Sequence, residues 1–156
     1  MSARWAVVTF PGSNCERDCV RAAGPVLGHE VVEVWHKDSV PADVDCIIVP
    51  GGFSYGDYLR AGSLAAMSPV MASVKEHAAK GTLVIGICNG FQVLCEAGLL
   101  PGALMKNTSL RFRCHDSHLR VERGDSPFTR GQLNAGDVIR LPIAHGYGNY
   151  YVPADQ

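Results

Sequence analysis

The order of apolar and polar positions predicts alternating strands and helices over the first hundred residues. Four short, β-branched apolar runs have the length and composition of strands buried in a parallel sheet, at residues 5–10, 30–35, 45–49 and 82–87. Longer helical patterns lie between or after these runs, at residues 14–24, 63–80 and 88–98. This order predicts an α/β fold, a mostly parallel sheet with helices on both faces in a flavodoxin-like arrangement.

Two local signals set the predicted helix ends. Ser13 precedes Glu16 by three residues, which predicts a capping box and a helix that begins near Asn14. Gly81 follows the pattern at residues 63–80 and predicts its end, because glycine adopts the left-handed conformation that terminates helices.

The pattern changes after Pro101, where short strands follow one another without helices, at residues 103–106, 109–114, 118–122 and 138–143. We expect these to form a β-rich C-terminal extension. The chain reaches Gln156 without the last strand and helix that usually seal such a sheet, so the domain is expected to be incomplete at its C-terminus. With 156 residues and 47% hydrophobic content, the chain fits one domain over residues 1–156.

The charge balance and the cysteines of the chain disfavour some classes of function. The 14 Lys and Arg residues against 15 Asp and Glu residues give a net charge of -1, which supplies no field to attract nucleic acid or an anionic membrane. The six cysteines lie largely in apolar runs, so we expect reduced thiols and a cytoplasmic protein. The apolar stretch near the N-terminus is too short for a signal sequence or a membrane span.

Candidate chemistry centres on residues 86–90, a Gly-Ile-Cys-Asn-Gly segment placed directly between a predicted strand and a predicted helix. Glycines around a cysteine allow the sharp turn of a nucleophile elbow, which would push the sulfur of Cys88 out of the sheet. A helix N-terminus there favours negative charge. The alternative is a structural cysteine in a tight turn.

Acyl transfer also needs hydrogen-bond donors for an oxyanion. The elbow supplies one, the backbone N–H of Asn89. Gly51 and Gly52 end the neighbouring predicted strand and could supply the second.

Other candidates have weaker support. Cys114, His115 and His118 have loosely metal-like spacing but no second ligand pair, so we expect no metal. Residues 53–60 contain one glycine, Gly56, but no phosphate-binding motif, which favours an active-site or partner-facing loop. Cys15 is expected to face the edge of the sheet that carries the elbow, and Cys19 to lie in the core.

The segment at residues 86–92 resembles the Gly-x-Cys-x-Gly-x-Gln signature of class I, triad-type glutamine amidotransferases. More narrowly, the chain resembles the family of glutaminase subunits (PurQ type) of phosphoribosylformylglycinamidine synthase at four further segments, residues 10–18, 50–58, 97–104 and 143–146. The likeness runs from about residue 5 to the end.

This resemblance implies an enzyme of purine biosynthesis that hydrolyses glutamine. Cys88 would be the nucleophile, the N–H groups of Gly52 and Asn89 the oxyanion hole, and Phe53 and Gln92 part of the glutamine pocket. The implied partners are a large synthetase subunit (PurL type), which would bind ATP and magnesium, and a small PurS-type subunit. No cofactor is implied for this chain.

The sequence departs from the family in two places. It has no His-Pro-Glu segment, which carries the family's catalytic His and Glu, and it reads His145-Gly146-Tyr147-Gly148 where the family usually has Glu in place of Tyr. His145 could be a substitute base, although a pocket or subunit-contact role fits its motif better. The alternative function is therefore a truncated, catalytically inactive subunit that binds its synthetase partner.

A third interpretation is a different cysteine-elbow enzyme of the DJ-1/PfpI-like group, which shares the expected topology. Those proteins typically place His directly after the nucleophile, and this chain has Asn89 there. We rank this interpretation behind the other two.

Overall fold

The computed structural model describes residues 2–154, which form two compact units. The first unit takes in the chain up to Leu104 and again from Tyr150, and the second unit is Met105–Asn149. The expectation of a single domain over residues 1–156 stays a prediction.

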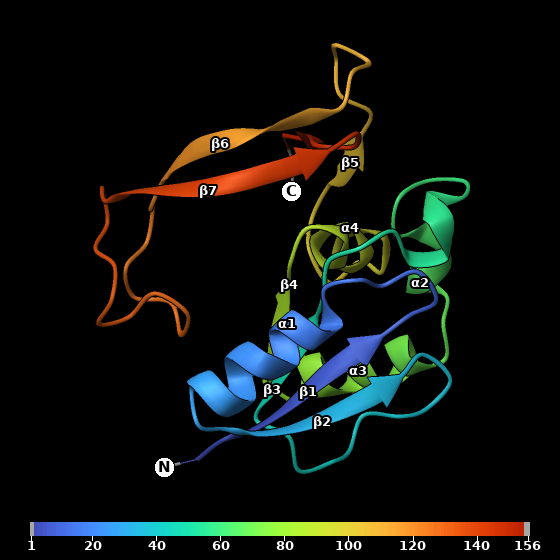
Figure 1. Cartoon of the computed structure of the whole chain (residues 1–156), viewed down its shortest axis with the longest axis vertical. Coiled ribbons are helices and arrows are strands. Elements are labelled where there is room, and N and C mark those ends of the chain that lie inside the picture. The colour runs from blue at the N-terminus through green and yellow to red at the C-terminus, as the bar shows by residue number, and fades with distance from the viewer. Residues whose placement is uncertain (1, 155–156) are drawn as a thin grey trace. The chain divides into compact units, whose positions relative to one another are not determined.

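The first unit is built on a four-stranded parallel sheet, as the sequence pattern predicts (Figure 1). Its strand order is β2-β1-β3-β4, with β1 at Arg4–Thr9, β2 at Glu30–Trp35, β3 at Cys46–Val49 and β4 at Leu83–Gly86. The register pairs Val49 at the end of β3 with Gly86 at the end of β4. The residues that follow these two strands are therefore neighbours at the carboxyl edge of the sheet.

Helices cover both faces of this sheet, which confirms the predicted fold class. Alternate residues of β1 point to opposite faces, so Val8 is buried in one apolar cluster and Val7 in another. The cluster around Val7 includes residues of α1 (Glu16–Arg21) and of the π-helical turn η1 (Ala22–Val26) that continues it. The cluster around Val8 includes residues of α3 (Val70–Ala79) on the opposite face (Figure 1).

The predicted capping box is wrong. Helix α1 begins at Glu16 with Cys15 at its N-cap, and no side chain caps it. The Ser13 hydroxyl instead accepts a hydrogen bond from the backbone N–H of Phe10, 3.0 Å away. Ser13 therefore closes the turn after β1 rather than the start of the helix.

The single helix predicted over residues 63–80 is also wrong, because the structure has two. Helix α2 covers Ser63–Ala66, and α3 begins after Pro69, which occupies its N-cap. Proline has no N–H to continue a preceding helix and is well placed at the start of a new one. Gly81 ends α3 as predicted, with φ of +89°.

The last helix of the first unit, α4, covers Asn89–Glu96 and follows β4 after two residues. Val93 and Leu94 are buried. Phe91 packs against the ring of Tyr150, with ring centroids 5.2 Å apart. None of the helices within residues 2–154 combines the length and the hydrophobicity needed to cross a membrane.

The second unit is a long hairpin of β6 (Arg113–Arg120) and β7 (Val138–His145), paired antiparallel (Figure 1). The two strands predicted at residues 109–114 and 118–122 are therefore one strand. A short pair, β5 (Ala103–Met105) with β8 (Asn149–Tyr151), marks where the chain leaves and re-enters the first unit. The β-rich character of this region is confirmed, although β8 was not predicted.

Candidate active site

Cys88 stands at the corner between β4 and α4 in a strained backbone conformation. Its φ and ψ are 53° and -107°, and its side chain is exposed. Non-glycine residues rarely adopt a positive φ, and a strained cysteine or serine at a strand-to-helix turn is the geometry of a nucleophile elbow. The Ile87 N–H fixes the corner to the neighbouring strand by a 2.9 Å hydrogen bond to the Val49 carbonyl.

The glycines on either side of Cys88 are required by close packing. A Cβ added to Gly90 would overlap the carbonyl of Val49, and one added to Gly86 would lie 2.7 Å from the backbone of Gly90. The helix therefore approaches the sheet more closely than any larger residue allows. The glycines were predicted to give room for a sharp turn, and the close approach of α4 to the sheet is a second reason for them.

The two backbone N–H groups predicted as oxyanion donors lie on the neighbouring segments at this edge. Asn89 directly follows Cys88, and as the first residue of α4 it has no carbonyl one turn earlier in the helix. Gly52 follows Gly51, where an added Cβ would lie 3.4 Å from Cβ of Cys88. Within residues 2–154, neither of these N–H groups donates a hydrogen bond to another residue.

The loop that contains Gly52 is tied to the loop after β1. The Phe53 N–H donates to the Gly12 carbonyl at 2.9 Å, and the Asn14 N–H donates to the Gly51 carbonyl at 3.4 Å. Gly52 has φ of +142°, which suits glycine. The Phe53 side chain, a predicted substrate contact, is half exposed.

Asn89 and Gln92 are both buried, and their side chains contact each other. Nδ2 of Asn89 donates to Oε1 of Gln92 at 2.9 Å, and Oδ1 of Asn89 accepts from the Ser54 N–H at 3.0 Å. Nδ2 also lies 3.4 Å from Oδ1 of Asp57. The Asn89 side chain thus joins α4 to the loop that begins at Phe53, a role that the sequence analysis did not assign.

That loop contains the turn η2 (Ser54–Asp57), which is strained and partly buried. Tyr55 and Asp57 have φ of 52° and 54°. Burial raises the pKa of the Asp57 carboxyl above its ordinary value. At the far end of the loop, the Arg60 guanidinium makes two 2.6 Å hydrogen bonds to the carboxylate of Glu96.

Tyr55 anchors the same loop on its other side. Its hydroxyl hydrogen bonds to Nδ1 of His36 at 2.8 Å and to Oγ of Ser68 at 2.9 Å. His36 and Ser68 are both buried. No motif in the sequence indicates this network, because its members come from three separate segments.

Cys15 lies at the carboxyl edge of the sheet, as the sequence analysis expected, beside the elbow. A Cβ added to Gly51 would lie 3.4 Å from Sγ of Cys15 and 3.4 Å from Cβ of Cys88. Burial raises the pKa of the Cys15 thiol, and Asp18 and Cys88 raise it further through their charges. Cys19 is buried, as expected for a core residue.

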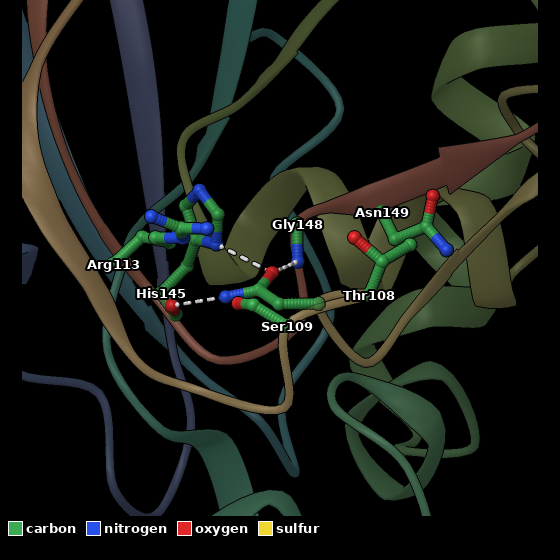
Figure 2. Close-up of a pocket in the computed structure, with 7 residues that line it drawn as sticks. Thr108, Ser109, Arg113, His145, Gly148 and Asn149 are labelled. Carbon is green, nitrogen blue, oxygen red and sulfur yellow. Dashed lines mark hydrogen bonds between the residues drawn. The ribbon is translucent and has the colours of Figure 1, made fainter.

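His145 belongs to the second unit and lines a polar pocket of about 250 Å³ there (Figure 2). Its Nδ1 lies 3.1 Å from Oδ1 of the buried Asn107, which also accepts a hydrogen bond from the Gly148 N–H at 2.9 Å. Nδ2 of Asn107 donates to the His145 carbonyl at 3.0 Å. Asn107 therefore holds the turn after β7. The roles predicted for His145, a pocket or subunit contact ahead of a substitute base, remain predictions.

The candidate metal ligands on β6 do not form a site. His115 lies on the other face of the strand from Cys114 and His118, because side chains alternate along a strand. Across the described part of the chain, no group of three or more His, Cys, Asp or Glu side chains is placed to hold a metal ion.

A parallel α/β sheet with a strained cysteine at a glycine-flanked corner defines the class of cysteine-elbow domains. The comparison with known families is more specific, because residues 2–156 match the model of the CobB/CobQ-like glutamine amidotransferase domain. The chain belongs to this family.

The chain is similar to curated proteins named phosphoribosylformylglycinamidine synthase subunit PurQ. It is 62% identical over 146 residues to the protein from Nitrobacter hamburgensis, covering 93% of this chain and 62% of that protein. It is 57% identical over 155 residues to the protein from Salinibacter ruber, covering 99% of this chain and 66% of the relative. The chain thus spans a little under two thirds of the length of these relatives.

Solved structures give the same result. The chain superposes on a chain of the structure of PurLQS from Thermotoga maritima with a TM-score of 0.92 and 46% sequence identity, covering 99% of this chain and 72% of that chain. The resemblance stated from the motifs and the predicted fold class are both confirmed.

Proposed function

We propose that this chain is a glutaminase subunit of a phosphoribosylformylglycinamidine synthase. It hydrolyses glutamine to glutamate and ammonia, and a synthetase subunit uses the ammonia to convert formylglycinamide ribonucleotide to formylglycinamidine ribonucleotide in purine biosynthesis. The observation that carries the proposal is the left-handed backbone of the exposed Cys88, between glycines that admit no side chain. The description of the matched family supports glutamine as the substrate, and the names of the relatives support the synthase.

In this proposal the Cys88 sulfur attacks the carboxamide carbon of glutamine. The negative charge that develops on the carboxamide oxygen is stabilised by the N–H groups of Gly52 and Asn89, which have no other acceptor among residues 2–154. Ammonia leaves, and water then hydrolyses the thioester. Phe53 and Gln92 belong to the glutamine pocket, with Phe53 contributing its exposed ring.

Release of ammonia also needs a group that protonates the leaving amine and activates water. The described histidines of the first unit have other contacts: His36 and His77 are buried and hydrogen bonded, and His29 stacks on Trp5. The proposal therefore assigns this role to none of them.

The proposed partners are a PurL-type synthetase subunit and a small PurS-type subunit. The solved structure of PurLQS, which contains a chain similar to this one, supports them. ATP and magnesium act on the synthetase subunit in this proposal, and this chain carries no cofactor. The proposed location is the cytoplasm, with residues 1–156 acting as one amidotransferase domain.

The test measures glutamate and ammonia release from glutamine, with the chain alone and together with the synthetase and small subunits. We expect turnover that falls by about 10³-fold or more in Cys88→Ala, because no other described group replaces the nucleophile. Cys114→Ala, which removes an exposed cysteine of the second unit, is the matched control and should keep the rate. A wild-type rate no higher than that of Cys88→Ala would reject catalysis and leave only a partner-binding role.

A further inference from the structure

Two cysteines far apart in the sequence lie together at the carboxyl edge of the sheet. Sγ of Cys15 and Cβ of Cys88 each lie 3.4 Å from the position that a Cβ of residue 51 would occupy. Sγ of Cys15 and Cβ of Cys88 are therefore no farther apart than twice that distance. Residue 51 is glycine, so no side chain of its own separates them.

The position of Cys15 is fixed by backbone hydrogen bonds. The Cys15 N–H donates to the Gly51 carbonyl at 3.3 Å, and the Asn14 N–H donates to the same oxygen at 3.4 Å. Cys15 is thus held against the segment that neighbours Cys88. Among residues 2–154 the Cys15 thiol donates only to Oδ1 of Asn14, at 3.1 Å, and rotation about the Cα–Cβ bond breaks this local contact.

The two thiols differ in exposure. Cys88 is exposed and Cys15 is partly buried, whereas the other cysteines of the first unit, Cys19, Cys46 and Cys95, are buried. Exposed sulfur is the first to meet an oxidant in solution, and a nearby second thiol captures the oxidised sulfur before further oxidation. Exposure therefore favours Cys88 as the thiol that is oxidised first, and its position beside Cys88 favours Cys15 as the resolving thiol.

We propose that Cys15 and Cys88 form a reversible disulfide that removes the nucleophile under peroxide stress. Hydrogen peroxide transfers one oxygen atom to the Cys88 thiol, giving a sulfenic acid and water. The Cys15 sulfur then attacks the Cys88 sulfur, the S–O bond breaks, and the hydroxide that leaves takes the Cys15 proton as a second molecule of water. A dithiol returns both residues to thiols by exchange. The loss of activity rests on the proposed function, whereas the disulfide itself does not.

The test treats the purified chain with hydrogen peroxide, blocks the remaining thiols with an alkylating reagent and maps linked peptides without reduction. Digestion by trypsin and chymotrypsin places Cys15 in residues 6–17 and Cys88 in residues 81–91, away from Cys19 and Cys95. We expect these two peptides to be linked in the wild type and in Cys114→Ala, and the link to disappear with dithiothreitol. In Cys15→Ala, Cys88 should instead accumulate as sulfinic acid.

A second variant tests the geometry while keeping both thiols. Gly51→Ala places a methyl group in contact with both residues, so the disulfide should form at least several-fold more slowly than in the wild type. Equal sulfinic acid at Cys88 in the wild type and in Cys15→Ala, or a link from Cys88 to another cysteine, would overturn the proposal. If the Cys15–Cys88 disulfide forms but the chain does not hydrolyse glutamine, the proposed function is rejected and the proposed disulfide stands.

Discussion

Oδ1 of Asn89 accepts a hydrogen bond from the backbone N–H of Ser54, at 3.0 Å and out of contact with solvent. This bond joins the first turn of the helix after the elbow to a loop of strained backbone. The residue after the nucleophile therefore has two functions in our interpretation. Under the proposed function its backbone N–H donates to the oxyanion, and its side chain holds the loop that begins with Phe53.

We predict that Asn89→Ala lowers kcat/KM for glutamine by about 10- to 100-fold, because the buried Ser54 N–H loses its acceptor and the loop loses its anchor. Asn89→Asp keeps the oxygen acceptor and should recover part of the loss. Asn134→Ala removes an exposed side chain of the second unit and is the control. An unchanged kcat/KM in Asn89→Ala would show that the loop needs no such anchor.

Gly90→Ala should destabilise the first unit by about 3 kcal/mol or more, because the added Cβ overlaps the Val49 carbonyl and forces α4 away from β3. The measurement is the urea midpoint by circular dichroism. Gly81→Ala is the matched control, since its Cβ meets nothing within 4 Å and it costs only about 1 kcal/mol for the positive φ. Equal losses in the two variants would contradict the close packing at the elbow.

Removing the Tyr55 hydroxyl should lower stability by about 1–3 kcal/mol, because Tyr55→Phe leaves the buried His36 and Ser68 without that partner. Thermal unfolding of Tyr55→Phe against the wild type measures this. Tyr58→Phe, at an exposed ring outside the network, should change little. A shift in Tyr58→Phe as large as that in Tyr55→Phe would mean that the network stabilises nothing.

Asp57 gives a pH-dependent prediction. Because burial raises the pKa of its carboxyl in the folded state, the folded chain holds this proton to a higher pH than the unfolded chain does. Its contribution to stability is therefore greatest at low pH and falls as the pH rises from about 3.8, the ordinary value, through the raised pKa. Asp57→Asn should be more stable than the wild type at pH 7, and the difference should vanish below that window.

The check is the free energy of unfolding of the wild type and Asp57→Asn between pH 3 and pH 8. Asp38→Asn, at an exposed carboxyl on another loop, is the control for a change of net charge. If the free energy of unfolding of Asp57→Asn at pH 7 is no higher than that of the wild type, burial does not disfavour the charged carboxyl.

The strands and the elbow could be predicted from the sequence because their signals are local. The apolar run at residues 30–35 matches β2 residue for residue, and the spacing of Gly86, Cys88 and Gly90 is itself a packing requirement. The break between α2 and α3 was not predicted, because an apolar helical pattern continues across Pro69, although a proline indicates a helix boundary.

The rest of the site could not be predicted because its contacts join distant segments. Ser54 and Asn89 are 35 residues apart in the sequence. Tyr55, which hydrogen bonds to His36, lies in a loop whose sequence has no periodic pattern. The same limit applies to Ser13, which has the spacing of a capping box but whose hydroxyl accepts a hydrogen bond from the Phe10 N–H instead. Local pattern indicates which groups are available, and tertiary structure selects their partners.

The meeting of residues 10–15, 50–53 and 86–89 at one edge has a consequence for folding kinetics. Each segment follows a different strand, so none can reach the others until β1, β3 and β4 have paired in register. Contacts between distant segments form late, because the entropy of closing the intervening chain must be overcome first. In a newly synthesised chain the Cys88 thiol is therefore present before the segments that surround it in the folded unit have come together.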